Sequence, residues 1–319
     1  MKKYIFILLA LFLSTYSWAQ RQITKDTYTY AVKDGIELKL DKYDLTGRPA
    51  QPLKPCVIFL FGGGFVNGER DSERYTSYFH ELTERGNIVV SIDYRKYLHG
   101  FDFSTISLSN KEEFAKLLVQ TINVATEDLF NATSFILKQA DEFGIDTTAI
   151  IISGSSAGAI TVLQGEYFLI NRHPLATILP SDFRYAGVVS FAGAVFTTES
   201  PLKWKEPPAP MLLFHGNADK NVPYDAVELE GAGFYGSKYI VKQLEELAIP
   251  YQFYDEEYAA HELADTPMQN QLELITNFIQ REVVAKEGLQ IHTMVKKIGK
   301  DVVKTDFSLE DYIQMNYGK

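Results

Sequence analysis

The chain has 319 residues, of which 46% are hydrophobic and 23% charged, with 21 glycines, 12 prolines and one cysteine. These proportions are typical of a globular protein with one large domain or two small ones, and they exclude collagen-like, coiled-coil and disordered chains. The formal net charge of −10 argues against nucleic-acid binding, because a phosphate backbone would repel so acidic a chain.

The first 19 residues have the features of a secretory signal peptide. Two lysines precede an apolar h-region at residues 4–12, and Ser17–Ala19 puts small residues where a signal peptidase reads the chain. We therefore expect cleavage before Gln20 and export to a periplasm or to the medium. The alternative is a membrane anchor, but the apolar stretch is about half of the roughly 20 residues that span a bilayer. After cleavage we expect no membrane span.

After residue 20, short apolar runs alternate with segments of helical periodicity. The first two runs flank Asp34-Gly35 and predict a β-hairpin. Most of the later runs are nearly continuous in apolar residues, as expected for parallel strands covered on both faces. The predicted strands are 27–32, 36–43, 56–61, 88–93, 149–153, 187–191, 211–215 and 251–254, and the predicted helices are 72–85, 112–142, 157–169, 237–247 and 267–285.

This order of elements predicts a single α/β domain over residues 20–285. We expect a mostly parallel eight-stranded sheet with helices on both faces. The last helix is expected to start with a cap, a proline and a capping box at residues 266–269, Thr-Pro-Met-Gln. Residues 286–319 show no clear period and are expected to be a C-terminal extension, with a short helix at 306–312.

The segment Gly154–Gly158 has the pattern G-x-S-x-G between a predicted strand and a predicted helix. A nucleophilic serine needs a tight strand-to-helix turn, where flanking glycines permit close approach and strained backbone angles. The pattern therefore predicts Ser156 as a nucleophile. The alternative is a helix N-terminus that is only capped by serines, and the strand and helix on either side favour the first interpretation.

A run of three glycines lies in Phe61–Phe65, at the end of an apolar strand. The backbone N–H groups of such a run have no side chain in front of them, which suits the binding of a developing oxyanion. A flexible turn is the alternative, but the later G-x-S-x-G pattern favours the functional interpretation. We expect the amides of Gly63, Gly64 and Ala157 to form an oxyanion hole.

A serine at such a turn needs a base and an acid, and on this kind of fold the chain order is Ser, then Asp or Glu, then His. Of the six histidines, only His261 and His292 qualify by this order, and His261 follows the last predicted strand. We predict His261 as the base. Asp219, just after another predicted strand, is the predicted acid, with Glu199 in reserve. His215 precedes Asp219, lies at the end of a predicted strand and is interpreted as structural.

Three further features accompany the predicted site. Asp255–Glu257 precede His261 by four to six residues, which suggests an acidic lip that disfavours anionic substrates; a solvated surface turn is the alternative. Residues 96–111 are expected to be an insertion above the site. Arg95 and Asp128 are expected to form a structural pair.

These motifs carry a family resemblance. The chain resembles α/β-hydrolases of the carboxylesterase and hormone-sensitive-lipase type, including bacterial acyl-sugar and feruloyl esterases. The family's H-G-G-G-[FW] motif stands here as Phe61–Phe65, with Phe61 in place of the histidine, and His215–Asp219 is similar to its acid loop. The resemblance covers residues 27–285. It implies the α/β-hydrolase fold and the hydrolysis of carboxylic esters, short-acyl or acyl-carbohydrate, through an acyl-enzyme without a metal or organic cofactor.

Two other functions fit parts of this pattern. A serine peptidase related to the prolyl-oligopeptidase group shares the order of the triad, but the triple glycine and the lack of a propeller-length N-terminal region argue against it. A non-catalytic binding member of the fold is disfavoured because all three triad residue types are present.

Cofactor sites have little support in the sequence. Gly231–Gly236 formally matches the dinucleotide pattern G-x-G-x-x-G, but the preceding segment 226–230 contains two glutamates and is a poor match to a buried central strand. We interpret the glycines as a connector into the next helix. The lone Cys56 excludes an intrachain disulfide and a cysteine-based zinc site.

Overall fold

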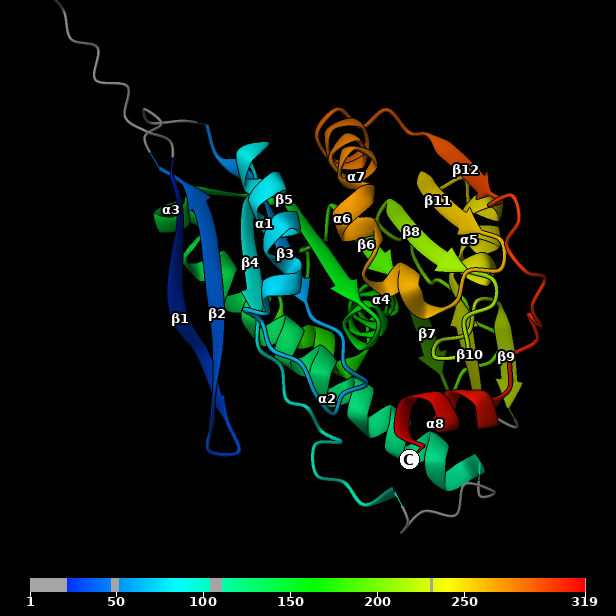
Figure 1. Cartoon of the computed structure of the whole chain (residues 1–319). Coiled ribbons are helices and arrows are strands. Elements are labelled where there is room, and N and C mark those ends of the chain that lie inside the picture. Colours follow the sequence, from blue (N-terminus) through cyan, green and yellow to red (C-terminus); the bar gives the residue numbers. More distant parts are fainter. Residues whose placement is uncertain (1–21, 47–51, 104–110, 230–231, 319) are drawn as a thin grey trace, which may run out of the picture.

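The computed structural model describes residues 22–46, 52–103, 111–229 and 232–318 (Figure 1). The signal peptide predicted over residues 1–19 lies outside these ranges and stays a prediction. Within the described ranges, none of the helices combines the length and the apolar character that crossing a bilayer requires.

A mostly parallel sheet of nine strands runs through the described part of the chain, in the order β1-β2-β4-β3-β5-β6-β8-β11-β12 (Figure 1). The first two strands pair antiparallel around the predicted Asp34-Gly35 turn, and β2 is also antiparallel to β4. All other neighbours are parallel. The strands are β1 (Ile23–Lys33), β2 (Ile36–Leu45), β3 (Lys54–Leu60), β4 (Ile88–Ile92), β5 (Ile145–Ser155), β6 (Gly187–Phe191), β8 (Met211–Gly216), β11 (Tyr251–Glu256) and β12 (Gln290–Val295).

The ninth strand comes from the segment that was expected to be an extension. Strand β12 pairs parallel with β11, from Tyr251 opposite Gln290 to Glu256 opposite Val295. Its residues alternate between exposed and half-buried, because it is an edge strand covered on one face only. It therefore lacks the continuous apolar run by which the central strands were recognised. The α/β class with a mostly parallel sheet is confirmed, and the count of eight strands is corrected to nine.

A second, antiparallel sheet has the order β7 (Ala194–Thr197), β10 (Ala232–Gly236) and β9 (Ala226–Leu229). The interpretation of the glycine-rich segment as a connector is wrong, since its described part is strand β10, and Gly231 lies outside the described residues. A dinucleotide site uses a central strand of a parallel sheet, which this arrangement does not provide.

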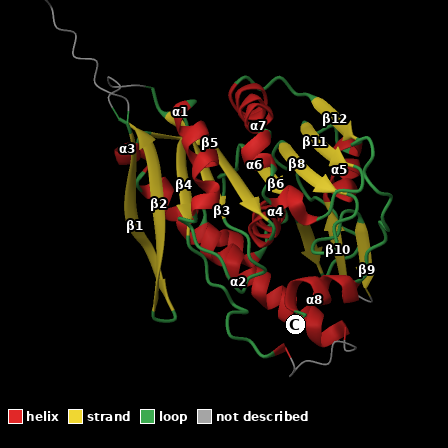
Figure 2. Cartoon of the chain, viewed as in Figure 1, coloured by secondary structure: helices red, strands yellow, loops and turns green. Residues whose placement is uncertain are grey.

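Helices cover the main sheet on both faces (Figure 2). Figure 1 shows α1 and α7 on one face and α4 on the opposite face. The α-helices are α1 (Thr76–Glu84), α2 (Lys111–Lys138), α3 (Ala140–Phe143), α4 (Ala157–Ile170), α5 (Ser237–Glu246), α6 (Pro267–Asn270), α7 (Leu272–Phe278) and α8 (Leu309–Tyr317), and the other helical turns are η1 (Glu73–Tyr75), η3 (Pro174–Ile178), η4 (His261–Ala264) and η5 (Ile279–Val284).

The last predicted helix, 267–285, is divided into three pieces. Pro267 is the first residue of α6, as predicted, but Thr266 already has helical angles (φ −59°, ψ −34°) and its side chain forms no capping hydrogen bond. The predicted capping box is therefore wrong. Gln271, with φ −123° and ψ 25°, separates α6 from α7.

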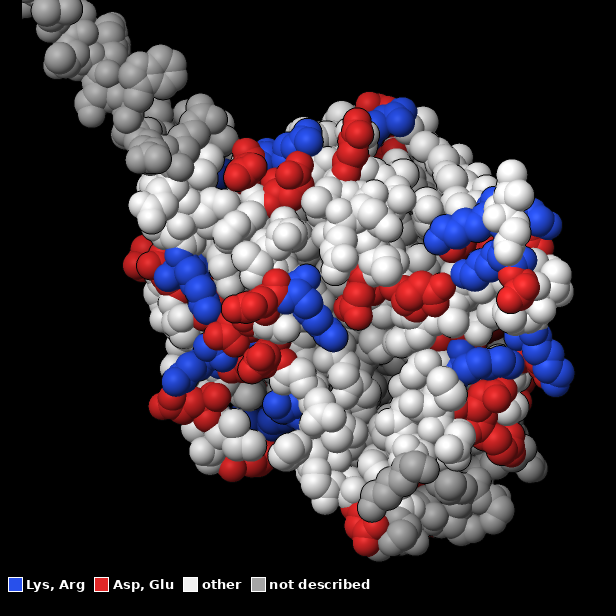
Figure 3. Space-filling view, viewed as in Figure 1, with Lys and Arg blue, Asp and Glu red and all other residues white. Residues whose placement is uncertain are grey.

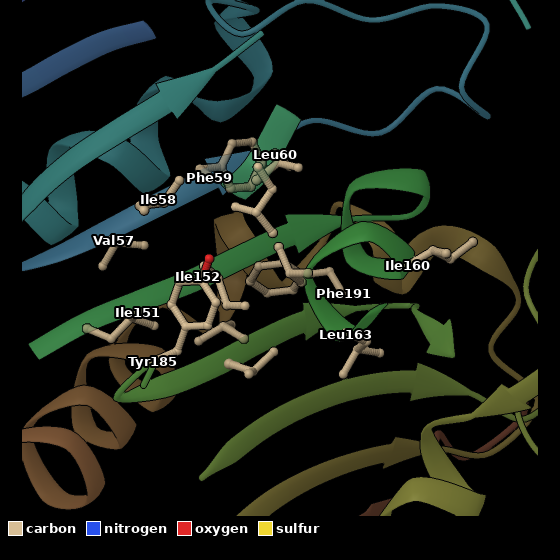
Figure 4. Close-up of a cluster of buried hydrophobic side chains, with 14 of the residues drawn as sticks. Val57, Ile58, Phe59, Leu60, Ile151, Ile152, Ile160, Leu163, Tyr185 and Phe191 are labelled. Carbon is tan, nitrogen blue, oxygen red and sulfur yellow. The ribbon is translucent and has the colours of Figure 1, made fainter. Parts of the chain in front are cut away.

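The core lies between the central strands and α4 (Figure 4). The apolar side chains of β3 and β5 are buried on both faces of the sheet, and those of Val57–Leu60 and Ile150–Ile152 are fully buried. Helix α4 is buried along its whole length, which is expected of a helix that is apolar on all sides. Ser156, the residue before its first turn, is consequently attached to a fully buried helix.

The predicted pair of Arg95 and Asp128 is confirmed. The Nη2 atom of Arg95 lies 2.8 Å from Oδ1 of Asp128, and the Arg95 backbone N–H donates to Oδ2 over 2.8 Å. Burial is the main reason that the pKa of Asp128 is raised, in spite of this guanidinium. The pair connects the segment after β4 to helix α2, so its role is structural.

Candidate active site

Ser156 lies on the sharp turn from β5 to α4, at the carboxyl end of a central strand. Its backbone angles are φ 52° and ψ −115°, which is a strained conformation for a residue other than glycine. The flanking glycines permit this turn: a Cβ on Gly154 would lie 2.3 Å from the carbonyl oxygen of Gly158, and one on Gly158 would lie 2.2 Å from that of Leu60. The spacing of the G-x-S-x-G pattern thus has a packing cause.

His261 lies between Ser156 and Asp219. Its Nε2 is 2.8 Å from Oγ of Ser156, and its Nδ1 is 2.7 Å from Oδ2 of Asp219. The three residues come from the start of α4, the loop after β8 and the first residue of η4 after β11. The carboxyl ends of these parallel strands meet at one edge of the sheet, so residues far apart in the chain become neighbours. The structure brings together the three residues that the sequence predicted.

Asp219 is buried and held in a fixed orientation. The backbone N–H groups of Asn221 and Val222 donate to its Oδ1 over 2.7 and 3.0 Å. Burial by itself would raise the pKa of Asp219, but His261 and His215 beside it outweigh this and hold the pKa well below its usual value. The carboxylate therefore stays ionised and is able to stabilise a charged imidazole.

His215 also contacts the carboxylate of Asp219. Its Nε2 lies 3.3 Å from Oδ2 of Asp219, and its Nδ1 lies 2.8 Å from Oγ of Ser237. It is fully buried, which agrees with its interpretation as structural. Glu199, the reserve acid, is exposed after β7, and Asp219 occupies the place beside His261.

The glycine run borders the same cavity as Ser156 and His261. Gly63 has φ +131° and Gly64 has φ +63°, and a Cβ on Gly63 would lie 2.4 Å from the carbonyl oxygen of Asn67. Only glycine fits at Gly63 without movement of the loop. Ala157 is buried directly after Ser156, as the first residue of α4. That the amides of Gly63, Gly64 and Ala157 bind an oxyanion stays a prediction.

Two tyrosines brace the strand end at Phe61, the residue that stands in place of a histidine in the motif that this segment resembles. The ring of Phe61 stacks on Tyr94 at a centroid distance of 4.4 Å, and the Tyr94 hydroxyl donates to the Phe61 carbonyl over 2.8 Å. The Gly62 N–H donates to the Tyr75 hydroxyl over 3.1 Å. Stacking and two phenol hydrogen bonds thus fix the residues that lead into the glycine run.

The cavity beside Ser156 has a volume of about 310 Å³ and a largely polar lining. Arg74 and Asp265 face each other across 3.8 Å on its wall, so their charges balance. Sequence reasoning did not identify these residues, because their segments meet only in the folded chain. The other side chains on the lining are Val66, Asn67, Ser155, Asn221, Ala264, Met315 and Asn316.

The acidic lip hypothesis is wrong, because every one of its carboxylates has a side-chain partner from the segment 290–300, a lysine for two of them and an imidazole for the third. Figure 3 shows acidic and basic side chains interspersed on the face that carries β12. Glu256 is also buried, and none of the three residues lines the cavity of Ser156. The pairs are Asp255 with His292 (3.1 Å), Glu256 with Lys297 (2.6 Å) and Glu257 with Lys296 (2.9 Å).

Within the described ranges, no group of three or more His, Cys, Asp or Glu side chains is arranged to hold a metal ion. The chemistry available at the site is that of a serine hydroxyl, an imidazole and a buried carboxylate in one hydrogen-bonded chain. This constellation suits nucleophilic attack by Ser156 on a carbonyl carbon.

Comparisons with known proteins find similar sequences over part of the chain. Residues 38–165 match the model of the carboxylesterase family, a stretch that includes the glycine run and Ser156. The chain is 28% identical over 134 residues to Esterase B1 of Culex pipiens, covering 42% of this chain and 22% of that protein. It is 26% identical over 159 residues to Neutral cholesterol ester hydrolase 1 of Pongo abelii, covering 49% and 32%. A Neuroligin-like protein, glit-1 of Caenorhabditis elegans, is 25% identical over 173 residues, covering 53% and 21%.

A solved structure extends the likeness to the fold. Esterase 2 of Thermogutta terrifontis, in its apo form, superposes with a TM-score of 0.59 at 19% identity, covering 81% of this chain and 94% of that one. The fold is that of the α/β-hydrolases. Within it, residues 38–165 are similar in sequence to the carboxylesterase family. The chain spans between 21% and 32% of the length of the three curated relatives named above.

Proposed function

We propose that the protein is an exported serine esterase that hydrolyses carboxylic esters through an acyl-enzyme. The observation that carries the proposal is the hydrogen-bonded chain from Ser156 through His261 to the buried Asp219 at a strained strand-to-helix turn. The match to the carboxylesterase family over residues 38–165 supports it. Export rests on the leader predicted over residues 1–19, and a mature chain that begins at Gln20 would support it.

In the proposed reaction, Oγ of Ser156 attacks the carbonyl carbon of the ester while Nε2 of His261 takes the hydroxyl proton. The bond to the alcohol oxygen then breaks, and His261 delivers the proton to the departing alkoxide. The acyl group remains on Ser156 until a water, activated by the same imidazole, releases it as a carboxylic acid and restores the hydroxyl. Asp219 keeps the imidazole oriented and stabilises its cationic form.

The polar lining of the cavity favours an ester with a short acyl group and a polar alcohol, a carbohydrate included. Asn67, Asn221 and Asn316 border the cavity, and each carries an amide that both donates and accepts hydrogen bonds, as sugar hydroxyls also do. A volume of about 310 Å³ is at the lower end of the range for small-molecule pockets. A small polar ester fits this space better than a long acyl chain.

An ester panel tests the proposal against its alternatives. It contains p-nitrophenyl acetate, butyrate and octanoate, an acetylated methyl xyloside, methyl ferulate and a proline p-nitroanilide. We expect turnover of the acetate and of the acetylated xyloside, and none of the anilide. Hydrolysis of the anilide alone would identify a peptidase. Tight binding of a substrate without turnover of any would identify a non-catalytic member of the fold.

Replacing Gly63 by Ala should lower kcat for p-nitrophenyl acetate by about 100- to 1000-fold, the loss expected when one oxyanion donor is displaced. The reason is steric: the new Cβ would meet the Asn67 carbonyl at 2.4 Å, so the loop must move. Gly35→Ala is the matched control, since Gly35 also has a positive φ (+77°) but open space around it and lies in the remote β1–β2 hairpin. A wild-type kcat for Gly63→Ala would refute this part of the oxyanion hole.

A further inference from the structure

Helix α8, near the end of the described chain, begins at a well-defined cap. The Ser308 hydroxyl accepts a hydrogen bond from the Asp311 N–H over 3.0 Å, and the Asp311 carboxylate accepts one from the Ser308 N–H over 2.9 Å. This reciprocal arrangement is a capping box, which fixes where the helix starts. The short helix expected at 306–312 thus starts three residues later and continues to Tyr317.

An apolar face holds α8 against the body of the protein. Leu309, Tyr312 and Ile313 are buried, and the Tyr312 ring packs edge-on against Phe114 of α2 and Phe234 of β10, at centroid distances of 6.0 and 5.5 Å. Figure 1 shows α8 in the same position, beside α2 and β10. Such burial gives the helix a fixed place.

The last turn of α8 reaches the glycine run and the predicted insertion. The Tyr317 ring stacks on Phe103 at 4.5 Å, and its nearest ring carbon lies 3.8 Å from the place of a Cβ on Gly64. Residues 96–103 also contact this region, since the Leu98 N–H donates to the Phe65 carbonyl over 3.1 Å. The rest of the insertion, residues 104–110, lies outside the described residues.

Polar contacts fasten α8 to the loop that carries the catalytic acid. The Asn316 side-chain amide donates to the Asn221 carbonyl over 2.8 Å, and Lys220 lies 3.4 Å from Asp311. The backbone N–H of Asn221 in turn donates to Asp219. The short loop from Asp219 to Asn221 therefore connects α8 to the serine–histidine–carboxylate chain. These contacts fix the position of α8 relative to the reacting atoms.

Met315 and Asn316 are consequently on the lining of the cavity that contains Ser156 and His261. Asn316 is hydrogen-bonded to Asn221, whereas Met315 is 57% exposed. A thioether side chain is unbranched and flexible, so it adapts to the shape of a group that lies against it. It also has apolar surface that a bound ligand would remove from water.

We propose that α8 forms a C-terminal wall of the substrate pocket and that Met315 is a specificity-determining residue. The part of the ester that extends from Ser156 toward α8 lies against the Met315 thioether, and Asn316 positions the wall through Asn221. The proposal rests on the ester hydrolysis proposed above. It adds the residue that discriminates between esters of different size.

The test compares Met315→Ala and Met315→Trp with the wild type on two series of esters. One series varies the acyl group, as p-nitrophenyl acetate, butyrate and octanoate, and the other varies the alcohol, as methyl, benzyl and naphthyl acetate. In at least one series, Met315→Ala should raise the ratio of kcat/KM for the largest over the smallest ester by about 3- to 10-fold, and Met315→Trp should lower it by a similar factor. The series that responds identifies the group that faces α8.

The matched control is Gln314→Ala, since Gln314 precedes Met315, is exposed and does not line the cavity. It should leave both ratios unchanged. A purely structural role of Met315 would change kcat/KM for all esters by one common factor, so unchanged ratios in both variants would overturn the proposal. A wild type that hydrolyses none of the esters would overturn the proposed function itself, and an active wild type with unresponsive variants would overturn only the role of Met315.

Discussion

Ser156→Ala should lower kcat for p-nitrophenyl acetate by about four to six orders of magnitude, because it removes the attacking oxygen of a unit whose members act together. The melting temperature should stay close to that of the wild type. The substitution removes one atom from a small side chain, and alanine accepts the same backbone angles at about the same cost as serine. Steady-state kinetics and thermal unfolding of the same preparation measure the two effects.

Ser153→Ala is the control for this result, three residues earlier on β5. Its Oγ lies 2.9 Å from the Tyr78 hydroxyl, and both side chains are fully buried. The substitution leaves the phenol without this partner, which should lower the free energy of unfolding by about 1–3 kcal/mol while kcat is kept. The two variants thus separate chemistry from stability. Loss of kcat in Ser153→Ala, with kcat retained in Ser156→Ala, would move the nucleophile away from the predicted turn.

Local patterns were sufficient for much of the fold and for the serine–histidine–carboxylate chain. The β5–α4 turn could be predicted because its glycine spacing has a steric cause at Gly154 and Gly158. Asp219 and His261 could be predicted because parallel strands end at one edge, so chain order determines which loops meet. In each case the signal lies within a few residues or follows from the topology.

The features that sequence reasoning missed depend on contacts between distant segments. Strand β12 has the alternating pattern of an edge strand, and its pairing with β11 is set by tertiary packing. The partners of Asp255–Glu257 come from residues 290–300, which include this strand, so the sequence could not show that these carboxylates are paired. The wall formed by α8 likewise depends on the contact between Asn316 and Asn221, which are 95 residues apart.

His261→Ala should lower kcat by about as much as Ser156→Ala, and the double variant should be no slower than either single one, since the residues act as a unit. His292→Ala is an unusually close control. Both histidines pair with an aspartate, His261 with Asp219 at 2.7 Å and His292 with Asp255 at 3.1 Å.

Of these two pairs, only His261–Asp219 is also hydrogen-bonded to a serine hydroxyl, that of Ser156. His292 lies on the exposed side of β12 beside Phe253, where its loss should change kcat by no more than about threefold, as expected of a peripheral site. If any histidine–aspartate pair were enough for activity, His261→Ala and His292→Ala would lower kcat by similar factors. If a base other than His261 served Ser156, His261→Ala would keep most of its kcat. The assignment of His261 as the base would then be wrong. A large loss confined to His261→Ala is the result that the 2.8 Å contact with Ser156 requires.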